Sequence, residues 1–309
     1  MRAMRAARLG SNGPPISVIG LGAWEAGGAD WGPNESEDAV VDAIRSALDV
    51  GITWIDTAEV YGKGVSEELV GRAIGGRRDE VFVATKVAPA DEGSGLAPAE
   101  VRAACAASLA RLGMDRVDLY QLHWPDPFGT PIEDTWETMC ELQDAGLVRY
   151  LGVSNFTREL IERCLAIRHV DSLQQEFSML SLDDRELIRW CGEHGIGVVS
   201  YSPLGAGLLT GSLARERVAS LDDWRGSDRE GLFSDAGMDR AYAMLANLSP
   251  IAERLGISLS QLALAWNLAQ PGVTSAIAGS RNPDHIRMNA AAGDIELDLA
   301  TLGEIETLL

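Results

Sequence analysis

Basic residues are scarce in this chain compared with acidic ones. Of its 309 residues, 26 are Lys or Arg and 46 are Asp or Glu, which gives a formal net charge of −20. Nucleic acids and anionic membranes are bound mainly through basic surfaces, so neither is an expected partner. An anionic ligand would need a local positive feature on this acidic protein.

Cysteines and long apolar runs are also scarce. The four cysteines are widely spaced and form no CxxC pair, so we expect reduced thiols rather than disulfides or a metal site. No apolar run reaches the roughly 18 residues of a membrane span. The basic segment 1–10 lacks the following apolar run and small-residue cleavage site of a signal peptide. These absences predict a cytoplasmic protein with no membrane attachment.

Strand-like and helix-like segments alternate along most of the chain. Eight strand-like runs are each followed by a helical pattern, in units of roughly 30 residues. The runs cover residues 19–22, 52–56, 81–86, 117–123, 149–153, 172–176, 197–201 and 273–278. Buried strands that alternate with helices indicate a parallel sheet, and eight units favour a closed (β/α)8 TIM barrel.

The alternative is a doubly wound open sheet, which requires a glycine-rich fingerprint after an early strand. The segment Gly20–Glu25 contains GxG but lacks the third glycine, and no helix follows it at once. No low-complexity linker divides the chain, so residues 1–309 are expected to form a single domain.

Several segments add to the barrel repeat. Turn-rich residues between Arg5–Leu9 and Ile16–Val18 predict an N-terminal β-hairpin. Residues 202–238 form a long excursion, followed by an extra helix over 239–255 and a terminal helix over 299–309. Ser66 is expected to cap the helix over 67–74, with acidic residues in its first turn.

Polar residues end three successive strand-like runs. Asp56, Lys86 and His123 stand at these ends, and Tyr61 follows five residues after Asp56. In a barrel of this kind, reactive groups lie at the carboxyl ends of the strands, so the four side chains should meet in one pocket. Taken singly, each has a plainer explanation: a loop histidine, a solvated lysine, or an Asp–Lys pair that closes the barrel mouth.

Together the four residues would form a proton-transfer device. A tyrosine with its usual pKa near 10 is a poor acid at neutral pH, and a nearby ammonium lowers that pKa. Lys86 would play this part, held and oriented by Asp56. Tyr61 would then act as general acid–base, and His123 would position a carbonyl oxygen by a hydrogen bond.

With these residues the sequence resembles a known family, the aldo-keto reductases, which are NAD(P)H-dependent enzymes built on a (β/α)8 barrel. The similarity runs from Leu21 to Asn289. Residues 56–62 (DTAEVYG) match the family's aspartate–tyrosine segment, and Lys86 with His123 completes its catalytic tetrad. Residues 151–156 (LGVSNF) and 201–205 (YSPLG) match two further signatures. The resemblance implies reduction of a small carbonyl compound by hydride transfer.

The resemblance also implies the cofactor contacts. Ser154, Asn155 and Gln174 would bind the nicotinamide carboxamide, and Tyr201 would stack on its ring. The backbone of residues 204–211, with Gly205 and Gly207, would hold the pyrophosphate. Arg281 with Ser280 would bind the 2′-phosphate of NADPH, and Asn289 the adenine. Further contacts are expected from Gly22, Trp24, Ser202, Pro203, Leu204, Gly279 and His285.

Two departures from the family leave the cofactor open. Some members carry a lysine at the position of Gly279 and an arginine at that of His285, so NADH stays an alternative to NADPH. Trp24 and Trp124, and more weakly Trp224, would line an apolar substrate pocket. The substrate, the direction of the reaction in the cell and the oligomeric state are not predicted.

Two other functions are alternatives to a reductase. The first is a cofactor-sensing regulatory subunit with the same fold and little turnover. The second is a barrel hydrolase with Asp56 and His123 as metal ligands. The hydrolase hypothesis leaves Lys86 and the Ser154–Asn155 pair unexplained, so no metal is expected.

Overall fold

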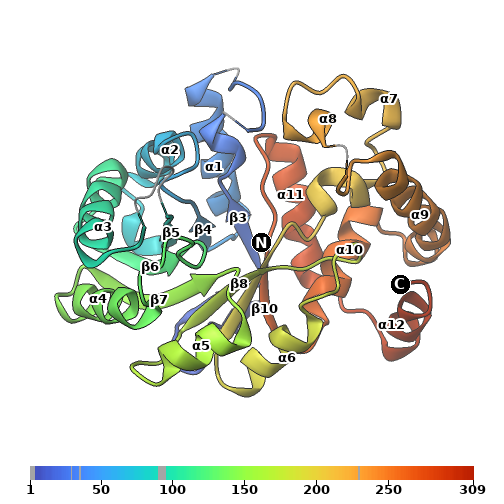
Figure 1. Cartoon of the computed structure of the whole chain (residues 1–309). Helices are drawn as coiled ribbons and strands as arrows, with labels where there is room; N and C mark the ends of the chain where they lie inside the picture. Colours follow the sequence, from blue (N-terminus) through green and yellow to red (C-terminus); the bar gives the residue numbers. More distant parts are fainter. Residues whose placement is uncertain (1–3, 29, 35, 90–94, 229) are drawn as a thin grey trace.

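Eight parallel strands close into a barrel at the centre of the molecule (Figure 1). The computed structural model describes residues 4–28, 30–34, 36–89, 95–228 and 230–309. In order of pairing, the strands are β10 (Val273–Ile277), β3 (Ile19–Gly22), β4 (Trp54–Asp56), β5 (Phe82–Val87), β6 (Val117–Leu122), β7 (Val148–Ser154), β8 (Ser172–Glu176) and β9 (Gly197–Tyr201). Strand β10 pairs with both β3 and β9, which closes the ring and confirms the predicted (β/α)8 barrel.

Helices surround the barrel and connect its strands (Figure 1). They are α1 (Glu37–Asp49), α2 (Val65–Ile74), α3 (Pro98–Leu112), α4 (Ile132–Asp144), α5 (Arg158–Leu165), α6 (Arg185–Glu193), α10 (Leu259–Leu268) and α11 (Pro283–Ala291). Apolar residues at helical spacing turn one face of each amphipathic helix toward the barrel, as Val40, Ile44 and Leu48 do in α1.

The N-terminal hairpin covers the end of the barrel at which the strands begin. It consists of β1 (Ala6–Arg8) and β2 (Pro15–Ser17), as predicted. The Ser11 N–H donates to the Gly195 carbonyl just before β9, at 2.7 Å. Leu9 and Ile16 are buried in a cluster with Trp54 from β4. The opposite, carboxyl ends of the strands stay accessible.

The long connection between β9 and α10 carries most of the additional structure. It contains η3 (Gly205–Thr210), α7 (Arg215–Val218), α8 (Trp224–Ser227) and α9 (Asp235–Leu255). Helix α9 begins before the predicted start at Asp239, because the Ser234 hydroxyl accepts from the Gly237 N–H at 3.1 Å and caps it. The remaining short elements are η1 (Glu25–Gly27), η2 (Arg78–Glu80), η4 (Ala292–Asp294) and α12 (Leu299–Glu306).

The predicted capping role of Ser66 is wrong. Helix α2 begins at Val65, and Gly64 in a left-handed conformation precedes it. Ser66 is buried, and its hydroxyl donates to the Ala23 carbonyl at 2.6 Å and contacts the Thr57 hydroxyl at 2.8 Å. The sequence pattern of a cap is present, but burial directs this hydroxyl to the loop that follows β3.

The cysteines and the helices can be compared with the expectations of reduced thiols and of no membrane span. All four cysteines are buried and free. Within the described ranges, no helix has the length and apolar character needed to cross a membrane. The first three residues of the basic N-terminal segment lie outside the described residues.

Candidate active site

A large cavity opens at the carboxyl ends of the barrel strands. Its volume is about 1860 Å³, beyond the roughly 300–1,000 Å³ of most small-molecule sites. The predicted site residues that line it are Gly22, Trp24, Asp56, Tyr61, His123, Trp124, Ser154, Asn155, Gln174, Tyr201, Ser202, Pro203, Leu204, Gly207, Gly279, Ser280, Arg281, His285 and Asn289. Lys86 and Gly205 are buried and do not border the cavity.

Lys86 contacts Asp56 and Tyr61, two residues that line this cavity. Strands β4 and β5 are paired, which brings Lys86 beside Asp56. The fully buried Lys86 ammonium donates to Asp56 Oδ2 at 2.6 Å, to the Thr57 carbonyl at 2.9 Å and to the Tyr61 hydroxyl oxygen at 3.2 Å. An ammonium has three N–H donors, so these bonds use all of them. Tyr61 accepts from Lys86 and keeps its own proton for another acceptor.

The expected lowering of the Tyr61 pKa is not found. Burial raises the pKa of Tyr61 well above its usual range, and the Asp56 and Glu25 carboxylates raise it further. The physical reason is that desolvation penalises a phenolate, and the nearby carboxylates penalise it further. Burial also lowers the pKa of Lys86, and Asp56 opposes that effect. Tyr61 is therefore a protonated phenol at neutral pH.

His123 faces Tyr61 from the end of β6. The two rings are nearly perpendicular, with centroids 5.7 Å apart. Burial, followed by the Lys86 charge, lowers the pKa of His123 well below its usual range, so the imidazole is neutral. Its Nδ1 is buried without a hydrogen-bond partner among the described residues. A neutral imidazole has one N–H donor, which suits an oxygen in the cavity.

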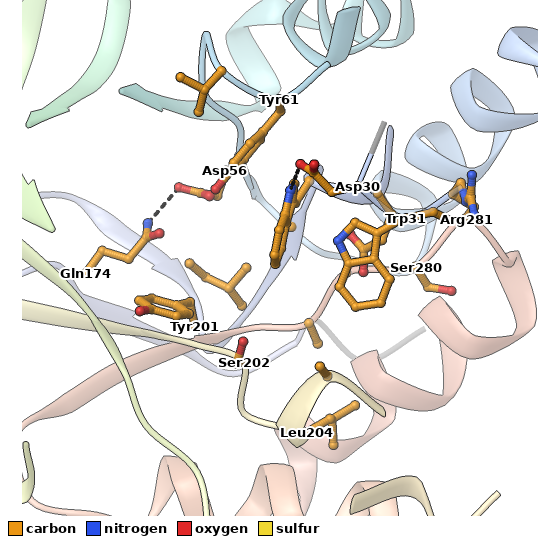
Figure 2. Close-up of a pocket in the computed structure, with 18 of the residues that line it drawn as sticks. Asp30, Trp31, Asp56, Tyr61, Gln174, Tyr201, Ser202, Leu204, Ser280 and Arg281 are labelled. Carbon is orange, nitrogen blue, oxygen red and sulfur yellow. Dashed lines mark hydrogen bonds between the residues drawn. The ribbon is translucent and has the colours of Figure 1, made fainter. Parts of the chain in front are cut away.

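Polar groups on β7, β8 and β9 form a second network. Gln174 donates from Nε2 to Asp56 Oδ1 at 2.7 Å, so it contacts the first cluster directly (Figure 2). The Tyr201 hydroxyl donates to Asn155 Oδ1 at 2.9 Å, and Asn155 Nδ2 donates to the Ser154 hydroxyl at 3.1 Å. Asn155 has a φ of 61°, an uncommon left-handed conformation that often marks functional sites.

The turn after β9 is shaped by its own hydrogen bonds. The Gly205 N–H donates to the Ser202 carbonyl at 2.9 Å, and the Gly207 N–H to the Leu204 carbonyl at 3.1 Å. Ala206 and Gly207 have φ values of 50° and 102°. These two glycine amides are thus engaged within the turn, and a phosphate-binding role for residues 204–211 stays a prediction.

Arg281 is held by the loop that follows β3. Its guanidinium donates to the carbonyls of residues 31–33 and to Asn34 Oδ1 at 2.9–3.1 Å. The sequence predicted that Arg281 binds a phosphate, whereas in the structure its hydrogen-bond partners are oxygen atoms of the loop. Arg281 still borders the cavity, beside Ser280 and ahead of α11.

Aromatic residues from two segments join across the cavity. Trp24 stacks on Tyr61 and on Trp224, with centroids 6.1 Å apart in both pairs, and its indole N–H donates to Asp30 at 2.9 Å. Trp31 lies edge-on to Trp24 at 5.3 Å, and Arg225 lies over its ring at 4.4 Å. The loop 24–34 and the excursion 202–238 are therefore packed together.

The predicted substrate residues differ in their surroundings. Trp124 stacks on His123 with centroids 3.7 Å apart, and 43% of it is exposed, so it forms an apolar rim. Trp24 and Arg225 line the cavity, whereas Trp224 does not line it and instead stacks on Trp24. Among the described residues, no group of three or more His, Cys, Asp or Glu side chains could hold a metal ion.

Sequence reasoning missed Glu25. Its carboxylate lies against Gly279, so close that a Cβ at that glycine would come within 2.3 Å of Oε2. Burial raises the pKa of Glu25, while Arg281 and Arg225 oppose that effect. Only the proximity of Glu25 to the GxG segment hinted at this position, and its neighbour Gly279 is distant in the sequence.

The chain is similar to reductases and to one channel subunit. It is 37% identical to aldo-keto reductase YhdN of Bacillus subtilis, with 97% of this chain and 92% of the relative covered. It is 34% identical to the NADH-specific methylglyoxal reductase of Escherichia coli, with 95% of each covered. It is 31% identical to a probable voltage-gated potassium channel subunit beta of Arabidopsis thaliana, with 94% and 92% covered.

Solved structures agree with this relationship. The glycerol dehydrogenase of Gluconobacter oxydans superposes with a TM-score of 0.86 at 30% identity, with 98% of this chain and 94% of that chain covered. An aldo/keto reductase of Klebsiella pneumoniae, solved with NADP and acetate, gives a TM-score of 0.77 at 32% identity and the same coverage. The model of the aldo/keto reductase family matches residues 18–309, and the chain belongs to this family of oxidoreductases.

Proposed function

We propose that this protein reduces an aldehyde or ketone to the alcohol, with NADPH as hydride donor and Tyr61 as general acid. The observation that carries the proposal is the buried cluster in which Lys86 contacts both Asp56 and the Tyr61 hydroxyl at the cavity wall. Family membership supports the reaction class. The substrate is a small carbonyl compound, and we expect a single domain over residues 1–309 in the cytoplasm.

The cavity fits a dinucleotide in size and chemistry. It reaches from Tyr61 and His123 to Arg281 and Asn289, and its volume leaves room for a substrate beside a cofactor. Amide and hydroxyl groups of Ser154, Asn155 and Gln174 would hold the nicotinamide end. Tyr201 offers a ring face for stacking. Arg281, Ser280 and the N-terminus of α11 would hold the adenosine phosphate, because a helix N-terminus favours an anion.

The residues of the chain supply the proton and its control. When bound, the reduced nicotinamide supplies a hydride to the carbonyl carbon. Tyr61, which is a neutral phenol at neutral pH, donates its proton to the carbonyl oxygen as negative charge develops there. Lys86 then stabilises the phenolate that forms, through its contact at 3.2 Å. Neutral His123 orients the carbonyl oxygen, while Trp24 and Trp124 exclude water from an apolar substrate.

Replacing Tyr61 by Phe tests this assignment. The proposal requires turnover with an aldehyde, followed as loss of NADPH absorbance at ~340 nm, to fall by about 10²-fold or more, the usual contribution of a general acid. Binding of NADPH by the variant, measured by fluorescence titration, separates a chemical defect from an unfolded protein. Unchanged turnover of Tyr61→Phe would show that another group delivers the proton.

A second candidate function is a cofactor sensor with little turnover. It is favoured by the similarity to a probable potassium channel subunit beta. Tight binding of NADPH, combined with no oxidation by any member of a carbonyl panel, would favour the sensor. The same measurements, made with NADPH and with NADH, would show which cofactor the protein prefers. Both are candidates, because one relative is described as NADH-specific and a solved relative contains NADP.

A further inference from the structure

The loop after β3 binds Arg281 through four oxygen atoms. Arg281 Nη1 donates to the Gly32 and Pro33 carbonyls at 3.1 Å and to Asn34 Oδ1 at 2.9 Å, while Nη2 donates to the Trp31 carbonyl at 2.9 Å. Arg281 and Pro33 also border the same cavity. The loop therefore sets the orientation of the guanidinium at the place where the adenosine phosphate is expected.

These contacts leave one edge of the guanidinium available. Both hydrogens of Nη1 and one hydrogen of Nη2 are used by the loop. Nε and Nη2 form the other edge of the guanidinium, where Nε has no acceptor and Nη2 has only the Trp31 carbonyl among the residues that the structure describes. This pair of donors is the fork with which an arginine binds two oxygens of one phosphate group.

Asn34 connects this arrangement to the rest of the site. Its Oδ1 accepts from Arg281, and its Nδ2 donates to the Ala26 carbonyl in η1 at 2.8 Å. The other side of the loop is held where Arg225 lies over Trp31 at 4.4 Å. Arg225 is itself fixed by Asp223 at 2.6 Å. The loop is therefore held on both sides. Within the described residues, Asn34 is the only one whose side chain forms a hydrogen bond with Arg281.

We propose that Asn34 is a positioning residue for cofactor selectivity. By holding Nη1 of Arg281, it keeps the Nε–Nη2 edge oriented for the 2′-phosphate that distinguishes NADPH from NADH. This inference rests on the proposed function, because it assumes that the cavity binds these dinucleotides. It explains why an arginine whose partners are loop oxygens can still select a phosphate.

Fluorescence titration of NADPH and NADH with Asn34→Ala tests the proposal. Loss of an acceptor to a charged donor lets Arg281 reorient, so the Kd for NADPH should rise about tenfold, while that for NADH stays within about twofold. The exposed Asn247 on α9 provides the matched control, and Asn247→Ala should change neither Kd. An equal loss for both dinucleotides would mean a general structural role and overturn the proposal.

A double-mutant cycle asks whether Asn34 acts through Arg281. In an Arg281→Ala background, Asn34→Ala should have no further effect on the Kd for NADPH, because the group that it orients is gone. Additive losses would overturn the proposal. Arg281→Lys gives a second measure: it keeps the charge but not the fork, and should lose most of the preference for NADPH.

The failures of the two proposals are distinguishable. If the wild-type protein binds neither dinucleotide, the proposed function is wrong and the inference falls with it. If Arg281→Ala weakens NADPH binding while Asn34→Ala and Arg281→Lys do not, cofactor binding stands and the positioning role of Asn34 is wrong.

Discussion

At the scale of single residues, Asp56 and Lys86 depend on each other. Lys86 is fully buried, and its ammonium lies 2.6 Å from Asp56, which is also buried. Removing one partner of a buried ion pair leaves the other charge uncompensated, at a cost of about 3–5 kcal/mol. The pair therefore couples the stability of the barrel to the contact that supports Tyr61.

We predict that Lys86→Met lowers the free energy of unfolding by about 3–5 kcal/mol, measured by urea denaturation. The double variant Asp56→Asn, Lys86→Met should lose less than the sum of the two single variants, because it leaves no buried charge. Strict additivity would contradict the coupling. Lys86→Met and the double variant should both turn over aldehyde more slowly, since neither keeps the ammonium that contacts the Tyr61 hydroxyl.

We predict that Glu25 makes the affinity for NADPH depend on pH. Burial raises the pKa of Glu25, and an anion bound beside it would raise that pKa further, so binding takes up a proton. Affinity for NADPH should be fully present below the raised pKa and decrease as the pH rises through it, above the usual carboxyl value of about 4.3. The Kd from fluorescence titrations across this range measures the effect.

The Glu25→Gln variant removes the titrating group and should flatten this pH dependence. Glu253→Gln, an exposed position on α9, is the matched control and should behave as the wild type. A pH profile of Glu25→Gln that follows the wild type would show that another group titrates.

At the scale of elements, the loops at the strand ends are fitted to each other through glycine. Gly62 has a φ of 60°, and a Cβ on it would lie 2.1 Å from the Gly27 carbonyl oxygen. The turn that carries Tyr61 and the η1 turn that carries Glu25 thus touch through backbone atoms. No side chain fits between them.

Gly62→Ala should therefore destabilise the protein and displace Tyr61. Gly76 is the matched control, because its φ of 82° imposes similar backbone strain while nothing lies within 4 Å of its Cβ position. Gly76→Ala should cost about 1–2 kcal/mol from the left-handed conformation alone, and Gly62→Ala clearly more, in urea denaturation. Equal costs would contradict the close contact. Only Gly62→Ala should slow aldehyde reduction.

The elements themselves were largely predictable, and the exceptions have local causes. Apolar periodicity located all eight barrel strands, because parallel strands buried on both faces read as short apolar runs. Ser66 resembled a cap, but the φ of Gly64 and the burial of the hydroxyl determine where α2 begins. The start of α9 was placed too late, since Ser234 lies in a polar segment without apolar periodicity.

At the scale of the whole molecule, the cavity joins segments from both halves of the chain. Residues of β4, β7 and β9 line it together with residues of α11. A ligand that binds only the folded protein stabilises it by mass action. NADPH at about 100 times its Kd should therefore raise the free energy of unfolding by about 2.7 kcal/mol.

This stabilisation should appear as a rise of several degrees in the thermal midpoint. NADH at the same multiple of its own Kd should give an equal rise, because the effect depends on the ratio of ligand concentration to Kd. With Arg281→Ala, a fixed NADPH concentration should give a smaller rise. No shift at any concentration of either dinucleotide would contradict cofactor binding.

The sequence by itself determined the barrel and the identity of the four residues of the predicted tetrad. The barrel and the four residues can be predicted from local patterns, because the carboxyl ends of all strands in a parallel barrel meet at the same end of the barrel. The tertiary structure decided the direction of the Tyr61 pKa shift and the partners of Arg281. Desolvation depends on everything packed around a group, and Arg281 meets Asn34 across 247 positions of sequence. Such contacts have no local pattern, so folding alone creates them.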